Sequence, residues 1–448
     1  MIRIRKGLDL PLAGAPRQQV EAGKSVRSVA LLGSDYPGMR PTLHVAEGDR
    51  VKRGQVLFDD KKNPGVSFTA PAAGKVVAIN RGAKRFMLSV VIDITEGGDD
   101  QAFESWNPGL LGSSDSQAIR DLLIESGEWT AIRTRPYGQV PEVDHKPSAI
   151  FVPAMDTNPL AADPSVVISA DLEAFKNGLK VLQTQTDGPV WVCRADGSSL
   201  PEFADENVRE ESFSGPHPAG NPSTHIHFLH PVSRHRSVWV VGYQDVIAIG
   251  HLFKAGKIHN ERVIALAGPQ AREPRLVKTK VGASVEELCQ DEMLEGDNRI
   301  VSGSVFNGHH AHGPVGYLNR SANQVTILRE GNHRDLFGYL SLGLERHSQR
   351  NIYLSKLWPK KRLALDTSTN GSERAMVPLG QYEEIMPLDI LPTQLLRSLI
   401  VGDTEMAEQL GALEVVEEDL ALCTYVCVGK YEYGPILRDN LERIQSEG

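Results

Sequence analysis

The sequence has few cysteines, no excess of positive charge and no long apolar run. Its 448 residues contain four cysteines, too few for a disulfide scaffold and compatible with a reducing compartment. The net charge of −9 disfavours a nucleic-acid-binding protein, which usually presents a basic face. The most apolar stretch, 237–250, is interrupted by Gln244 and Asp245 and is shorter than the ~20 residues of a membrane-spanning helix. We therefore expect a soluble protein that reaches a membrane only through a partner.

Several catalytic and cofactor motifs are also absent. No GxGxxG follows an expected strand, which argues against a self-sufficient dinucleotide site, and no GxSxG elbow supports hydrolase chemistry. Histidines cluster in 217–235 and 309–312, where His225 and His227 stand at alternate positions and could face one ion. However, no recognised ligand spacing completes such a site. We therefore interpret both stretches as loop-rich surface structure and expect no metal.

The pattern of apolar residues changes along the chain and predicts an α/β multidomain protein. Residues 1–100 carry short alternating stretches between Gly and Pro turns, typical of a small barrel or sandwich. In 101–256 apolar strands alternate with helices, which indicates a parallel, doubly wound α/β domain. Residues 257–330 return to short strands around one helix, a compact α+β pattern, and 331–448 mix loops with helices.

Individual elements follow from the same spacing. A helix is expected over 117–126, with Ser116 as its cap. Further strands are expected at 149–154, 190–193, 238–241, 263–267, 276–281 and 325–328. Further helices are expected at 172–182, 245–255, 284–289, 393–400, 404–410 and 435–444.

Residues 45–79 resemble the biotinyl/lipoyl-type barrel-sandwich fold. The stretch reads VAEGDRVKRGQVLFDDKKNPGVSFTAPAAGKVVAI, and Gly48, Gly54 and Gly74 stand where we expect tight turns with positive φ. In carrier proteins of this fold a lysine at a hairpin tip, flanked by methionines, holds the prosthetic group. Here Lys61 and Lys62 lack flanking methionines. An unmodified structural barrel is therefore favoured, and a carrier function is an alternative.

The order of barrel, α/β domain, β-grasp-like unit and helical end resembles the family that includes the Rnf complex C subunit and the NADH/FMN-binding subunit of complex I. In those relatives a loop of the type GGAGFPT presents backbone N–H groups to the FMN phosphate. The corresponding stretch here, 126–141, places Glu128 and Trp129 where small residues are needed. An acidic ExEP motif of the relatives reads Asp156-Thr157-Asn158-Pro159 in this chain. The resemblance therefore implies that the flavin and NADH sites have been lost.

Longer motifs resemble the A subunit of the Na⁺-translocating NADH:quinone oxidoreductases over essentially the whole chain. They include IRKGLDLPLAG, DDKKNPGVSFTAPAAGKV, RTRPYGQVP, FVPAMDTNPLAA and CTYVCVGKYEYG. For the fold, this resemblance implies the following order of domains: a barrel-sandwich hybrid domain (1–100), a Rossmann-like α/β domain with a degenerate flavin/NADH site (101–256), a β-grasp, SLBB-like domain (257–330) and a helical C-terminal domain with a degenerate iron–sulfur region (331–448).

For function, the same resemblance implies a soluble subunit on the cytoplasmic face of the bacterial inner membrane, held there by membrane subunits. The complex would pass electrons from NADH to ubiquinone while exporting Na⁺. This chain would contribute to ubiquinone binding and would hold no flavin or iron–sulfur cluster, because NADH, flavins and clusters are used by other subunits. We expect the isolated chain not to be catalytic. An Rnf-type electron-input subunit that binds FMN and NADH is the alternative.

Cys423 and Cys427 are the only cysteines close together in the sequence. Their i, i+4 spacing would place both sulfurs on one face of a helix. A bacterial [4Fe–4S] site needs the run C-x₂-C-x₂-C-x₃-C-P, and here Val428 replaces the proline. We interpret the pair as the remnant of a cluster site that now consists of buried thiols. A redox pair and a metal shared with a partner remain alternatives.

A quinone site needs hydrogen-bond donors, an aromatic platform and a slot for the tail. We expect these in the cleft left by the flavin, between the stretches 31–39 and 126–141. The candidate quinone-binding residues are Leu32, Tyr36, Met39, Trp129, Arg133, Arg135 and Tyr137. His217 or His225 could also donate to a quinone carbonyl. The alternative is that Trp129 fills the core and the arginines form surface salt bridges.

Overall fold

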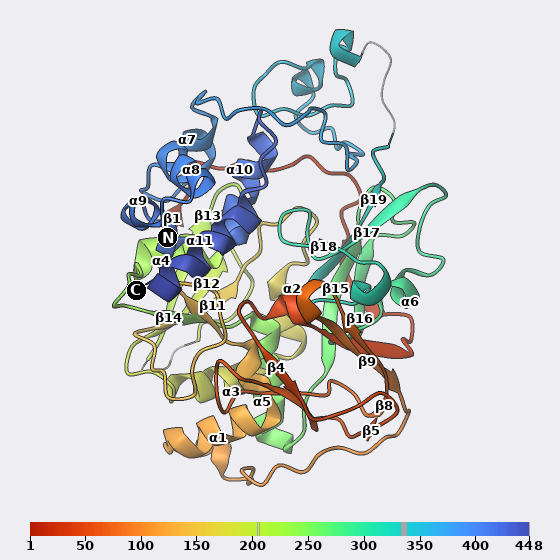
Figure 1. The fold of residues 1–448 in the computed structure, drawn as a ribbon, viewed down its shortest axis with the longest axis vertical. Coiled ribbons are helices and arrows are strands. Elements are labelled where there is room, and N and C mark those ends of the chain that lie inside the picture. The colour runs from red at the N-terminus through yellow and green to blue at the C-terminus, as the bar shows by residue number, and fades with distance from the viewer. Residues whose placement is uncertain (204, 206, 333–337, 448) are drawn as a thin grey trace.

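The computed structural model describes residues 1–203, 205, 207–332 and 338–447 (Figure 1). These described residues form four β-sheets, and α-helices predominate from residue 381 onward. In Figure 1 the first sheets (red to orange) lie at the lower right and the C-terminal helices (blue) at the upper left. Among the described residues, no helix combines the length and apolar character needed to cross a bilayer.

Two small antiparallel sheets form the predicted barrel or sandwich. Their orders are β3-β9-β8-β5 and β4-β6-β7. The strands are β3 (Ser28–Leu32), β4 (Pro41–Leu43), β5 (Arg50–Val51), β6 (Val56–Asp60), β7 (Ser67–Thr69), β8 (Gly74–Arg81) and β9 (Met87–Ile94). Gly48 and Gly54 have the expected positive φ, but Gly74 does not. Instead, Gly74 is required because a Cβ there would lie 2.0 Å from the Asp93 carbonyl oxygen of the paired strand.

The first 22 residues pair outside these two sheets. Strand β1 (Ile2–Arg3) runs parallel to β13 (Val208–Ser214) of the α/β sheet. Strand β2 (Arg17–Ala22) runs parallel to β16 (Arg275–Lys280) of the third domain. Each therefore extends the edge of a sheet built by residues far along the chain. Local alternation cannot predict this, because it reports which side of a strand is apolar and not which edge the strand joins.

The α/β domain has a sheet of order β1-β13-β12-β11-β14-β10. Its strands are β10 (Arg133–Arg135), β11 (Ile150–Ala154), β12 (Val190–Ala195), β13 (Val208–Ser214) and β14 (Val238–Val240), and its helices are α1 (Ser116–Ser126), α2 (Pro164–Ala170), α3 (Leu172–Gln183), α4 (Pro222–Leu229) and α5 (Tyr243–Ala255). All neighbouring strands are parallel except the pair β10 and β14. The predicted alternation of strands and helices is therefore present.

Helix α4 corrects the prediction of a histidine-rich loop. It begins with Pro222 at its first turn, a position where the missing N–H of proline costs nothing. His225 and His227 both lie on this helix. Most of the Gly and Pro residues that indicated a loop precede the helix, and Pro231 follows its end.

Asp115 caps α1, whereas the sequence pointed to Ser116. Its carboxylate accepts the backbone N–H groups of Gln117 and Ala118, both at 3.1 Å. Such a cap satisfies amides that have no partner within the helix. We expect Asp115→Ala to lower the free energy of unfolding by about 1 kcal/mol in chemical denaturation. Ser116→Ala is the control and should cost clearly less; a larger loss for Ser116→Ala would contradict this assignment.

The third domain has a mixed sheet of order β18-β17-β19-β15-β16-β2. Its strands are β15 (Glu261–Ala267), β16 (Arg275–Lys280), β17 (Asn298–Ser302), β18 (His309–His310) and β19 (Gln324–Arg329), with helix α6 (Val285–Cys289). All the strands and the helix predicted for this segment are present. The short strands β17 and β18 had not been predicted.

The expected helical domain over 331–448 is helical only in its second part. The described residues 338–380 contain 3-10 turns and loops but no α-helix, whereas short helices around their own core make up 381–447. They are α7 (Gln381–Ile385), α8 (Pro392–Val401), α9 (Thr404–Gln409), α10 (Ala421–Val426) and α11 (Tyr433–Glu447). Tyr382 and Tyr433 are fully buried in this core, and their hydroxyls are 3.0 Å apart. The three predicted helices of this part are present. Residues 333–337 and 448 of the expected helical domain lie outside the described residues.

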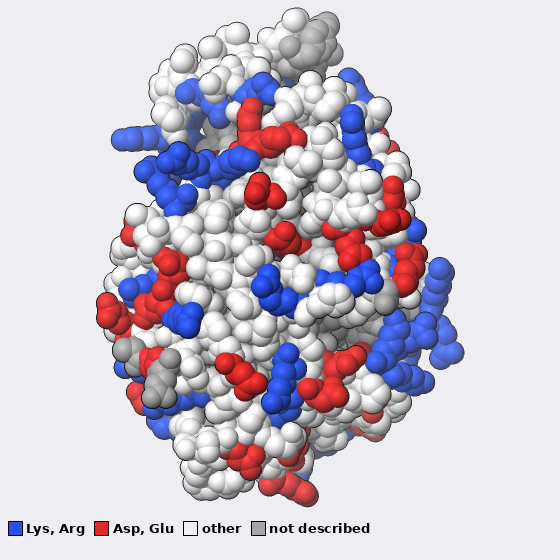
Figure 2. Space-filling model, turned by 90° about the vertical axis from the view of Figure 1, so that its left-hand side faces the viewer, with Lys and Arg blue, Asp and Glu red and all other residues white. Residues whose placement is uncertain are grey.

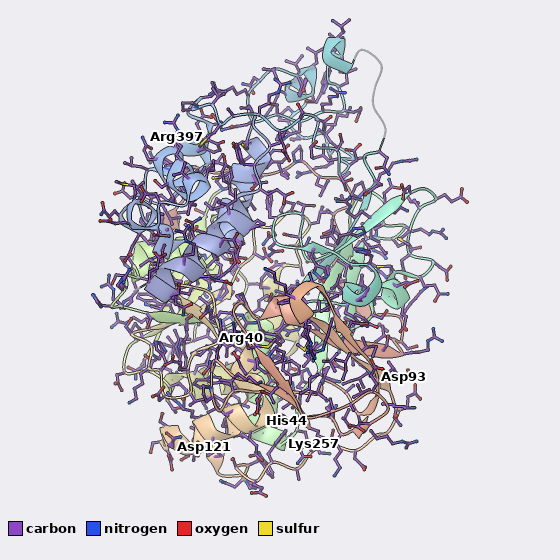
Figure 3. All side chains as sticks on the ribbon, in the orientation of Figure 1. Arg40, His44, Asp93, Asp121, Lys257 and Arg397 are labelled. Carbon is purple, nitrogen blue, oxygen red and sulfur yellow. The ribbon has the colours of Figure 1, made fainter. Side chains whose placement is uncertain are left out.

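The surface carries charges of both signs. On the face drawn in Figure 2, Asp and Glu side chains interrupt the Lys and Arg side chains, so this face presents no continuous basic surface. Figure 3 places Lys257 and Asp121 at the same end of the molecule. Lys257, which follows α5, lies 3.1 Å from the carboxylate of Asp100.

Candidate functional site

A groove of about 980 Å³ lies where the barrel, the α/β domain and α11 meet. From the sequence-predicted quinone site it is lined by Tyr36, Met39 and Tyr137. The stretches 31–39 and 126–141 therefore do face each other, as expected. Other lining residues are Lys62 and Asn63 of the barrel hairpin, Arg234 before β14, and Arg443 of α11. Figure 3 labels Arg40, which directly follows Met39.

Arg133 connects the stretches 31–39 and 126–141 without lining the groove. Its guanidinium lies 5.3 Å from the centre of the Tyr36 ring and donates to the Asp35 carbonyl oxygen at 3.1 Å. It also donates to the carbonyl oxygen of Thr130 at 2.5 Å. Burial lowers the pKa of Arg133 and raises that of Tyr36. Since its donors are engaged within the protein and it does not line the groove, Arg133 positions Tyr36.

Leu32, Trp129 and Arg135 do not line the groove. Leu32 and Trp129 are fully buried, and the Trp129 indole N–H donates to the Pro141 carbonyl oxygen at 2.9 Å. Trp129 thus fills the core, which was the alternative interpretation. Arg135 is also buried, and its guanidinium lies 3.5 Å from the Glu418 carboxylate in the C-terminal part. The expected surface salt bridge of Arg135 is therefore a buried contact between distant parts of the chain.

The stretch that corresponds to a flavin loop is closed by buried charges. Gly127 has φ 81° and leads into a 3-10 turn over Glu128–Ala131. The carboxylate of Glu128 lies 2.6 Å from the Arg320 guanidinium, which also lies 3.8 Å from Asp245. Although burial opposes its charge, Glu128 and Asp245 raise the pKa of Arg320. The position that needs small residues in a phosphate loop is thus occupied by an ion pair.

The tip of the barrel hairpin is docked against the same stretch. The Asn63 side-chain amide donates to the carbonyl oxygens of Val140 and Pro141, at 3.2 and 3.0 Å. On the other side, the Tyr137 carbonyl oxygen accepts from Arg438 of α11 at 2.6 Å. A carrier lysine needs a hairpin tip that is free to visit distant sites. The anchoring beside Lys62 therefore disfavours the carrier alternative.

Cys423 and Cys427 are buried in the C-terminal core. Cys423 lies on α10, and Cys427 directly follows the last residue of this helix, Val426, in the same core. Burial raises the pKa of Cys423. For Cys427 burial acts in the same direction, but hydrogen bonds from Tyr382 and Tyr433 lower the pKa below its usual value. The Cys427 sulfur lies 3.4 Å from the Tyr433 hydroxyl.

The two histidines on α4 bond different partners. The His225 ring bonds the Ala219 carbonyl oxygen at 3.0 Å, whereas His227 lies 2.7 Å from the Glu414 carboxylate. His217 stacks on Phe306 with 4.6 Å between ring centres. Burial lowers the pKa of both His217 and His225 to about 4. Neither of these two histidines lines the groove.

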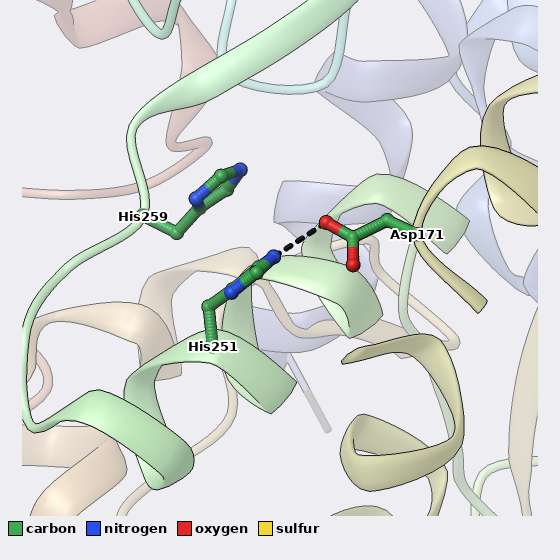
Figure 4. A group of neighbouring side chains, drawn as sticks. All are labelled: Asp171, His251 and His259. Carbon is green, nitrogen blue, oxygen red and sulfur yellow. Dashed lines mark hydrogen bonds and ion pairs between the residues drawn. The ribbon is translucent and has the colours of Figure 1, made fainter. Parts of the chain in front are cut away.

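A group that the sequence analysis missed consists of Asp171, His251 and His259 (Figure 4). Within the described ranges, it is the only set of three or more Cys, His, Asp or Glu residues whose ligand atoms lie close enough for one metal ion. No cysteine belongs to it. The residues are 80 and 8 positions apart and match no motif, so only a contact prediction between distant segments could have found them.

Three family models match the chain in sequence order. The NqrA N-terminal barrel-sandwich hybrid domain matches residues 2–95, and the NqrA second alpha/beta domain matches residues 114–258. The NQRA C-terminal domain matches residues 263–313. The first two descriptions agree with the paired small sheets and with the α/β sheet described above.

Full-length relatives are known from several bacteria. The chain is 62% identical to the A subunit of the Na(+)-translocating NADH-quinone reductase of Alcanivorax borkumensis and 58% identical to that of Pseudomonas aeruginosa, with 100% of each chain covered. A solved NAD+-reducing nickel–iron hydrogenase is similar over 73% of this chain and 63% of that chain, with 12% identity and a TM-score of 0.39. That similarity is too low to support an inference about function.

Proposed function

Because the chain belongs to the NqrA family, the A subunits of the Na⁺-translocating NADH-quinone reductases, we propose that it is a peripheral subunit of such a complex and binds ubiquinone in the groove lined by Tyr36, Met39 and Tyr137. The observation that carries the quinone proposal is this groove, where the partly exposed Tyr137 and Met39 lie beside the buried Tyr36. A quinone ring stacks on aromatic surface, and a flexible thioether adapts to an isoprenoid tail.

Polar groups at the rim of the groove complete the proposed site. Lys62 and Asn63 lie on the barrel side, and Arg234 and Arg443 lie on the opposite side. A quinone carbonyl needs one or two donors, which Lys62 and Arg443 can supply. The Asn63 amide already donates to two carbonyl oxygens, and Arg234 is paired with the Glu408 carboxylate. Arg133 has a positioning role, because it fixes the Tyr36 ring and has its own N–H groups bonded to carbonyl oxygens.

We further propose that the chain binds no flavin and no iron–sulfur cluster. NADH, flavins and clusters are then bound by other subunits of the complex. Two observations support it. The loop position that would cradle a phosphate is occupied by the buried Glu128 side chain, which is paired with Arg320. Cys193 and Cys289 lie in β12 and α6, in domains other than the C-terminal core of Cys423 and Cys427. A visible spectrum of the purified full chain with bound FMN or cluster absorption would contradict this part.

The same proposal places the chain on the cytoplasmic face of the bacterial inner membrane, attached through membrane subunits. The isoprenoid tail of ubiquinone is lipid-soluble, whereas no helix in the described ranges suits a membrane crossing. The tail must therefore enter the groove where the chain meets a membrane subunit. Cross-linking within the assembled complex from Lys62 at the groove to membrane subunits tests this placement.

We expect Tyr137→Ala and Met39→Ala each to weaken ubiquinone binding about tenfold, which corresponds to ~1.4 kcal/mol. Each substitution removes apolar surface that would contact the ring or the tail. The full chain is titrated with a short-chain ubiquinone, and saturation-transfer NMR measures the binding at each concentration.

Met406→Ala and Trp358→Ala are the matched controls. Both side chains are exposed, at 43% and 54%, and neither lines the groove. They should bind quinone as the wild type does. Photolabelling with an azidoquinone should mark residues 36–39 or 134–142. Labels that map only to other subunits, or equal weakening in the controls, would contradict the proposed site.

A further inference from the structure

Asp171, His251 and His259 meet where the chain passes from the α/β domain into the third domain. Asp171 links α2 to α3, and His251 lies on α5. His259 follows α5 and stands two residues before β15 begins. Figure 4 shows the three side chains arriving from three different segments. The group is distinct from the quinone groove, since none of the three lines it.

The donor atoms are close together and of the right chemical types. The ligand atoms of all three residues lie within 4.8 Å of one another. His251 Nε2 lies 2.5 Å from the Asp171 carboxylate, and the two imidazole rings stack with 4.2 Å between their centres. Two imidazoles and one carboxylate are a ligand set that Zn²⁺ and its neighbours in the first transition series bind well.

The helix packing holds two of the ligands in place before any ion binds. Helices α3 and α5 cross so closely that a Cβ on Gly250 would lie 1.9 Å from the Ala174 carbonyl oxygen. A Cβ on Gly178 would likewise lie 2.0 Å from the Val246 carbonyl oxygen. Asp171 directly precedes α3, and His251 directly follows Gly250. Their approach is therefore fixed by the contact between the helix backbones and not by flexible side chains alone.

The side chains retain the freedom and the access that an ion requires. All three residues are partly exposed, with 31% of the His251 side chain and 37% of the Asp171 side chain accessible. Tetrahedral Zn–ligand bonds of about 2.0–2.2 Å place two donor atoms ~3.4 Å apart. His251 Nε2 and the Asp171 carboxylate, which lie 2.5 Å apart without an ion, must therefore separate slightly, and the more distant donor pairs must approach. Small rotations of half-exposed side chains achieve this without any change in the helix crossing.

We propose that Asp171, His251 and His259 bind one divalent transition-metal ion, for which Zn²⁺ is the best fit, with water in the remaining position. On binding, the ion takes the place of the proton between His251 Nε2 and Asp171, and that proton is released to solvent or moves to Nδ1. The ion links α3 and α5 to the segment that enters β15. It therefore acts as a clamp between the α/β domain and the third domain.

The experiment is calorimetric titration of the chelator-treated full chain with ZnCl₂. We expect one ion per chain, and about a 100-fold loss of affinity in His251→Ala and in His259→Ala. Asp171→Asn keeps the size of the side chain but removes its charge, and should weaken binding about tenfold. Zinc should also raise the thermal unfolding temperature of the wild type more than that of these variants.

The double variant His310→Ala/His312→Ala is the matched control. These rings also stack, at 4.4 Å between centres, but no carboxylate completes a three-ligand group with them in the described part of the chain. The control should bind zinc as the wild type does. The proposal is overturned if the wild type binds no zinc, if His251→Ala and His259→Ala bind it unchanged, or if only the control loses binding. Circular dichroism of each variant establishes that it is folded.

Discussion

Trp129→Ala is expected to lower the free energy of unfolding by about 3–5 kcal/mol, the range found when large aromatic side chains are truncated in cores. Trp129 is fully buried and meets Trp239 edge to face, with 5.2 Å between ring centres. Its indole N–H donates to the Pro141 carbonyl oxygen, which would lose this partner. Chemical denaturation followed by circular dichroism measures the loss.

Trp358→Ala is the control for this measurement, because that side chain is 54% exposed. We expect its effect to stay within about 0.5 kcal/mol. Quinone binding by folded Trp129→Ala also separates two roles of this residue. A core role predicts lost stability with at most a small change in affinity, whereas a strong loss of affinity at unchanged stability would show that Trp129 contacts the quinone.

Glu128→Gln is expected to cost about 3 kcal/mol of unfolding free energy, because it leaves the Arg320 charge buried without its nearest carboxylate. The two side chains are only 3% and 12% exposed, and they lie 2.6 Å apart. Asp245 remains near Arg320, but at 3.8 Å. The pair joins the α/β domain to the third domain, so the loss should appear in the unfolding of both.

A second substitution tests whether the unpaired Arg320 charge causes the loss of stability in Glu128→Gln. Arg320→Met in the Glu128→Gln background removes the stranded charge, and we expect it to restore much of the lost stability. The matched surface pair is Glu261 and Lys278, which lie 3.6 Å apart with more than half of each side chain exposed. Breaking that pair should cost less than about 1 kcal/mol. Equal costs for the two pairs would contradict the role assigned to Glu128.

Much of the candidate groove could be predicted from the sequence, but not which side chains reach it. Bulky residues at 128 and 129 indicated a filled cleft, and the structure has both side chains buried. Which of Arg133, Arg135 and Tyr137 turns toward the groove depends on the path of the chain after the 3-10 turn. That path is set by contacts with Asp35, Glu418 and Arg438, which lie about 100 to 300 residues away in the sequence.

By itself, the sequence determined the type and order of the segments and the absence of a dinucleotide motif. Alternation and helical spacing are local, and burial of an apolar face follows from them directly. Only the tertiary structure decided that β1 and β2 complete sheets of other domains, and that Asp171, His251 and His259 meet. The reason is physical: such contacts depend on how closely helices and sheets pack, and packing between distant segments leaves no periodic signal in the sequence.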